Sequence, residues 1–113
     1  MARTVLAVQQ VTINGAAPTF AAADQANGME FANNGDVILE VKNTSASPVT
    51  VTLTTPITVE GIALTDPAIS VPATTGDRIF GTFSPQVFNQ AGGTVYVDFS
   101  ASSGVTIAAY KLR

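Results

Sequence analysis

The strongest constraint on this chain is a two-residue alternation of side chains that recurs in segment after segment. It is clearest over residues 36–42, 49–54 and 94–100, where one face is apolar and the other is largely polar. A period of two is typical of a β-strand with one buried face. Val and Thr dominate these segments, as they do in strands generally. The apolar faces that we expect in a core are Val37, Leu39, Val41; Val49, Val51, Leu53; and Val95, Val97, Phe99.

Turn signals separate these segments at intervals of about 8–12 residues, the rhythm of a β-sandwich or small barrel. Seven or eight short strands fit this spacing, and helices do not alternate with strands, so we predict an all-β, antiparallel sandwich. The segment 105–112 is apolar on both faces near its end, so it is either a central strand or faces a partner. The main signals are Asn14-Gly15, Asn27-Gly28, Asn34-Gly35, Ser47-Pro48, Asp66-Pro67, Gly92-Gly93 and Ser103-Gly104.

Three segments need separate interpretation. Near the N-terminus the apolar phase shifts at Gln9-Gln10, which indicates either a bulged strand or an arm that pairs with another subunit. We therefore divide the chain into an arm and first strand at 1–13 and one sandwich domain at 14–113. The alanine-rich stretch 14–28 predicts a loop with a helical turn or one that packs flat on a sheet. Residues 84–89 predict a short helical turn that begins at Pro85 and closes one end of the sandwich.

The composition excludes much chemistry. The 113 residues contain no Cys, His or Trp, which removes disulfides, thiolate nucleophiles, histidine bases and Cys/His zinc sites. Nothing marks a catalytic carboxylate pair, a calcium loop or a phosphate loop. We expect no enzyme activity, no metal and no cofactor. Asn43-Thr44-Ser45 matches a glycosylation acceptor, which we interpret as a chance match in a loop.

The predicted surface is poor in charge. Only 12% of residues are charged, the net charge is −3, and threonines fill many outward strand positions. Such a face packs against other proteins at low desolvation cost, whereas nucleic acid and membrane are disfavoured as partners. The first eight residues are too short an apolar run for a signal peptide, so we expect folding in a cytoplasm. Seven residues are candidate interface positions: Arg3, Thr4, Val5, Leu6, Val8, Tyr96 and Tyr110.

Several short motifs resemble small β-proteins of tailed bacteriophages. They are Phe31-Ala32-Asn33-Asn34-Gly35, Leu39-Glu40-Val41-Lys42-Asn43, Val49-Thr50-Val51, Val71-Pro72-Ala73-Thr74-Thr75, Phe83-Ser84-Pro85 with Phe88-Asn89, and Gly93-Thr94-Val95-Tyr96-Val97. The resemblance spans roughly residues 29–112, and several of these proteins decorate phage heads as capsid cement. It implies a jelly-roll-like sandwich, often trimeric, seated over junctions between capsomers, and it offers no catalytic residues.

Together these features predict a structural virion protein. The leading expectation is a capsid decoration protein that assembles with itself, with a trimer favoured, and with the major capsid protein on the capsid surface, after folding in the host cytoplasm. One alternative is a tail or head–tail connector component. Another is a carbohydrate-binding or adhesin module, which would use Tyr96 or Tyr110 as a stacking platform.

Overall fold

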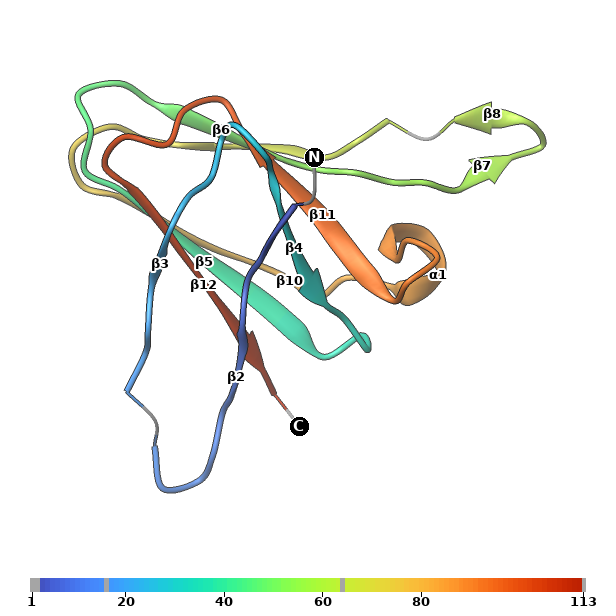
Figure 1. Ribbon diagram of the computed structural model, residues 1–113, viewed down its shortest axis with the longest axis horizontal. Coiled ribbons are helices and arrows are strands. Elements are labelled where there is room, and N and C mark those ends of the chain that lie inside the picture. The colour runs from blue at the N-terminus through green and yellow to red at the C-terminus, as the bar shows by residue number, and fades with distance from the viewer. Residues whose placement is uncertain (1–2, 16, 64, 113) are drawn as a thin grey trace.

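Two β-sheets packed face to face make up the protein, seen in Figure 1. The structure, a computed structural model, describes residues 3–15, 17–63 and 65–112. The predicted all-β sandwich is confirmed, but the sheets are mixed and not purely antiparallel, since β1 pairs in parallel with β4 and β2 with β12. The two sheets together contain ten strands in the described residues, more than the seven or eight expected. The additional strands are short and come from the first 22 residues, where the alternation is weak.

The first sheet has the order β1-β4-β11-β6-β9. The second has the order β10-β5-β12-β2, with β3 also pairing with β12. The remaining elements are the two-strand ribbon β7–β8 and the short helix α1. Bounds in the first sheet are β1 Thr4–Val5, β4 Met29–Ala32, β11 Thr94–Phe99, β6 Val49–Leu53 and β9 Ala68–Val71. In the second they are β10 Gly76–Gly81, β5 Val37–Asn43, β12 Val105–Lys111, β2 Val8–Gln10 and β3 Ala21–Ala22. The ribbon comprises β7 Thr58–Val59 and β8 Ile62–Ala63, and α1 is Pro85–Phe88.

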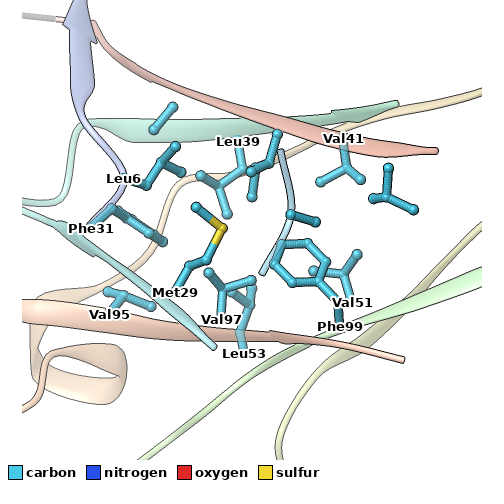
Figure 2. Close-up of a cluster of buried hydrophobic side chains, with 14 of the residues drawn as sticks. Leu6, Met29, Phe31, Leu39, Val41, Val51, Leu53, Val95, Val97 and Phe99 are labelled. Carbon is cyan, nitrogen blue, oxygen red and sulfur yellow. The ribbon is translucent and has the colours of Figure 1, made fainter. Parts of the chain in front are cut away.

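The core lies between the sheets and consists of the faces that the alternation predicted. All nine side chains expected there, from β5, β6 and β11, are buried. Figure 2 shows seven of them together with Met29 and Phe31 from β4 and Leu6 from the N-terminal segment; the seven are Leu39, Val41, Val51, Leu53, Val95, Val97 and Phe99. Phe31 also packs on Phe83, with ring centroids 5.6 Å apart. The two apolar layers therefore hold the sandwich together.

Strand β12 is central, which accounts for its apolar character on both faces. It pairs antiparallel with β5 along its whole length and with β3 near its start, and parallel with β2 near its end. Ala108 is buried although it lies on the outward face of β12. The stretch 14–28 supplies β3, so part of it packs as a strand.

The helical turn expected at 84–89 is present as α1, with Pro85 in its first turn. The Phe88 ring lies 5.5 Å from the Phe83 ring, edge to face, so α1 closes that end of the core. The two-residue alternation breaks just before α1. Phe80 lies opposite Leu39 and its half-buried side chain faces the core, yet Phe83, three residues later, is buried there too. No helix in the described part of the chain has the length and apolar character needed to cross a membrane.

Two segments extend beyond the sandwich (Figure 1). One comprises residues 54–63 and 65–67, which continue the hairpin between β6 and β9 and carry the β7–β8 ribbon; we call it the distal hairpin. The other is the loop from β2 to β3, which makes a turn at Ile13 and Asn14, closed by the Gly15 amide donating to the Thr12 carbonyl. In the described residues β7 and β8 pair only with each other, so neither strand belongs to a sheet of the sandwich.

Candidate interaction surfaces

Arg3 joins the N-terminal segment to the outer face of the first sheet. Its guanidinium donates to both carboxylate oxygens of Asp98, at 2.8 and 3.3 Å, and lies 4.1 Å from the centre of the Tyr96 ring. The same group donates to the carbonyl of Met29 at 3.3 Å. A Cβ at Gly28 would overlap this guanidinium, so the glycine of the predicted Asn27-Gly28 turn leaves room for the ion pair. Arg3 and Tyr96 thus lie together in one intramolecular cluster.

Thr4, Val5 and Leu6 continue along the edge of the first sheet. Thr4 and Val5 pair in parallel with β4, and the Thr4 hydroxyl donates to Asp24. That bond and the Asn27 amides hold the pKa of the Asp24 carboxyl below its usual value. Leu6 then points into the core and is 4% exposed, whereas Val5 is 74% exposed. Of these two candidate interface residues, only Val5 presents its side chain to solvent.

Val8 and Tyr110 lie at the other sheet. Val8 is half-buried in β2, opposite Ala109 of β12. The Tyr110 hydroxyl donates to Glu40 Oε1 at 3.0 Å across the outer face. Partial burial, this hydrogen bond and the negative charge of Glu40 raise the pKa of Tyr110 to about 12. Tyr96 is covered on one face by Arg3 and Tyr110 is tied to Glu40, so the two tyrosines, on opposite sheets, form no shared platform.

The distal hairpin has a defined base and an apolar tip. At the base, the Thr55 amide and hydroxyl both donate to Asp66 Oδ1, at 2.9 and 2.7 Å. These bonds hold the pKa of Asp66 below its usual value, the amide contributing most. At the tip, Glu60 and Gly61 have φ of 52° and 79°, the two positive values of a type I′ turn. Ile62, next to the turn, is 71% exposed.

A pocket of about 460 Å³ opens between the sheets at the end where β12 finishes. Val8 and Val37 supply apolar lining, and Lys111 supplies its only charge among the described residues. The other lining residues are Gln10, Ala32, Asn33, Asn34 and Gly93. Asn33 is already engaged, since its amide donates to the Phe83 carbonyl and to Asn89 Oδ1. The pocket is therefore mixed in character, with apolar walls and a cationic rim.

Sequence reasoning missed the distal hairpin, the pocket and the role of Asn43. The signal for the hairpin was Glu60-Gly61 between Thr58-Val59 and Ile62-Ala63. Asn43 is fully buried, and its amide donates to the carbonyls of Ser47, Val71 and Pro72. A side chain so placed is inaccessible in the folded chain, which agrees with the interpretation of the glycosylation motif as a chance match.

The described residues contain no group of three or more Asp, Glu, Cys or His side chains that could hold a metal ion. The comparisons with family models, curated proteins and solved structures gave no match. Function is therefore inferred from the chain itself.

Proposed function

We propose that this chain is a structural subunit of a virion, and specifically a capsid decoration protein of a tailed phage. The observation that carries the proposal is the exposure of large aliphatic side chains at the margins of a well-formed sandwich. They are Val5 at the free edge of the first sheet, Ile13 on the β2–β3 loop, Ile57 and Ile62 on the distal hairpin, and Ile79 on the edge strand β10. Ile57 and Ile62 lie on one short hairpin, and exposed apolar side chains that lie together are typical of surfaces that bind other proteins.

The outer face of the first sheet supports the same proposal. Thr50, Thr52 and Thr94 lie there, exposed or half-buried, while their chain neighbours point into the core. Uncharged hydroxyl side chains lose little solvation free energy when a neighbour covers them. The resemblance of the motifs in residues 29–112 to phage head proteins gives the class of neighbour: further copies of this chain and the major capsid protein.

The mechanism would be mechanical. A subunit that binds the assembled shell, but not its separated parts, stabilises the shell by mass action. Subunits seated over junctions between capsomers would each contact more than one capsomer, so dissociation of the shell would require loss of these contacts as well. The virion surface would be the site of action, after folding in the host cytoplasm.

The test is to purify the chain and measure its native mass alone and with undecorated heads of the phage that encodes it. We expect a small oligomer, with a trimer favoured, and saturable binding to assembled heads but not to free capsid subunits. A strict monomer that does not bind heads would contradict the proposal. A ring of six or twelve would instead favour a tail or connector component.

A carbohydrate-binding role receives no support from the tyrosines that suggested it. A stacking platform needs an open ring face, but Arg3 covers one face of Tyr96, and Tyr110 lies on the other sheet. Glycan-array binding by the purified domain, lost on Tyr110→Ala but kept on Val11→Ala, would overturn this assessment.

A further inference from the structure

The distal hairpin projects from the sandwich and has features of a segment that binds another molecule. Its two strands are only two residues each and pair with each other, and such a ribbon is marginally stable alone in water. Its turn also places a non-glycine residue, Glu60, at positive φ, which costs free energy in an isolated hairpin. Ile57 and Ile62 remain exposed on it. In the described residues β7 and β8 pair with no other strand that would offset this free energy. The hairpin is therefore suited to contact with another molecule.

The pocket at the end of β12 has a lining that could accept such a segment. Its walls are aliphatic and amide groups, and its one charge is the Lys111 ammonium. The described residues form a single ion pair, Arg3 with Asp98, and Lys111 has no part in it. Asp36 lies beside the end of β12, since its carbonyl accepts from the Leu112 amide, but it makes no ion pair with Lys111. The half-buried Lys111 is thus open to an external anion.

We propose that the distal hairpin of one copy of this chain inserts into the pocket of a second copy, with Glu60 pairing with Lys111. The two charges match: Glu60 is the one charged residue between Thr55 and Thr65, and Lys111 is the one charge of the pocket. Ile62, beside the turn, would cover the aliphatic wall formed by Val8 and Val37. This inference rests on the proposed function, because it assigns the surfaces through which one decoration subunit contacts another copy of itself.

The contact joins two different surfaces, so it is head-to-tail. Repetition of such a contact gives a closed ring if the rotation closes and an open chain if it does not. A hairpin tip buries less than the ~1,200–2,000 Å² of a stable interface. Association through one such contact should therefore be weak, in the micromolar range or above, and should strengthen when a ring closes or when subunits are already side by side on a shell.

The test is a charge swap in the full chain, read out by sedimentation velocity over a range of protein concentrations. Glu60→Lys alone and Lys111→Glu alone should each weaken self-association at least tenfold, and the double variant should recover it to within a few-fold. Lys42→Glu, on the outer face of β5, is the matched control and should change nothing. Ile62→Ala should weaken association without altering the charge.

Folding of every variant is checked by far-UV circular dichroism and thermal unfolding, and Glu60→Lys and Ile62→Ala change only exposed positions. Self-association that is unaffected by either single swap, or a wild-type chain that stays monomeric at all concentrations tested, would overturn the proposal. Both results leave the decoration role standing if the chain still binds undecorated heads. If the wild-type chain does not bind heads, but each single charge reversal weakens self-association and the double variant restores it, the decoration role would be wrong and the hairpin contact would stand.

Discussion

The sandwich and the distal hairpin contain the same kinds of aliphatic residue, but the sandwich buries their side chains and the hairpin exposes them. Ile107 on β12 is 0% exposed, whereas Ile62 on β8 is 71% exposed. Both lie in paired strands. The difference is the second layer. The inner face of β12 packs in the core between the sheets, while the β7–β8 ribbon extends beyond the sandwich (Figure 1) and its strands pair only with each other in the described residues.

This contrast separates two uses of apolar side chains. In the sandwich they bury against one another and supply the free energy of folding. In the hairpin they contribute little to folding, so their presence there is better explained by a contact with another molecule. Substitutions of chemically matched residues in the two regions test whether the apolar side chains really differ in this way.

The largest expected effect comes from the matched isoleucines. Ile107→Ala should lower the free energy of unfolding by about 2–5 kcal/mol, since it leaves a cavity in a packed core. Ile62→Ala should change it by less than about 0.5 kcal/mol, as for an exposed site. Urea unfolding followed by circular dichroism measures both. A comparable loss in the two variants would mean that the hairpin packs on the sandwich in solution.

A second pair tests where the N-terminal segment belongs. Leu6→Ala should lower the free energy of unfolding by about 2–4 kcal/mol, while its exposed neighbour Val5→Ala should have an effect below about 0.5 kcal/mol. The physical reason is that Leu6 lies between the sheets and Val5 lies at the free edge of the first sheet. Equal and small effects would show that residues 3–8 leave the sandwich in solution, as an arm would.

The sequence was informative wherever burial follows a simple period. Alternation identified the core faces of β5, β6 and β11, and Pro85 marked the start of α1. The apolar faces of 105–112 left two alternatives, of which the structure shows a central strand, β12, within its own sheet. These features depend on neighbours along the chain, which a linear pattern records.

The rest depends on residues that are distant in sequence. Arg3 meets Asp98 across 95 positions, and Asn43 reaches the Val71 and Pro72 carbonyls across 28 and 29. No periodicity encodes such pairs, because the Arg3–Asp98 pair depends on the strand order within the first sheet, and the Asn43 bonds depend on how the two sheets stack. The pocket is lined by four separate stretches of the chain, and the distal hairpin is too short to give a period of its own.

A third prediction concerns pH and the sandwich. The pKa of Tyr110 is raised to about 12 in the folded chain, so its neutral form is favoured by folding. Its contribution to stability is fully present below pH 10, the ordinary tyrosine value, and is lost as the pH rises to 12. We expect a loss of about 1 kcal/mol across this interval, since the side chain is only partly buried. Tyr110→Phe should remove this part of the decline, as measured by urea unfolding at several pH values, whereas Tyr96→Phe should retain it.

The smallest expected effect lies in the hairpin and concerns its base. The pKa of Asp66 is lowered because the carboxylate accepts from the Thr55 amide and hydroxyl. That stabilisation is therefore present above the ordinary Asp value and is lost as the pH falls through the lower pKa of the folded state. Since the hairpin contributes little to the core, we expect the Thr55 amide to lose protection from hydrogen exchange at acid pH while protection of β12 is unchanged. Asp66→Asn should abolish the pH dependence at Thr55, and Asp77→Asn on β10 should preserve it. Simultaneous loss of protection at Thr55 and in β12 would show that hairpin and sandwich unfold as one unit, and the distinction between a folding region and a docking region would then fail.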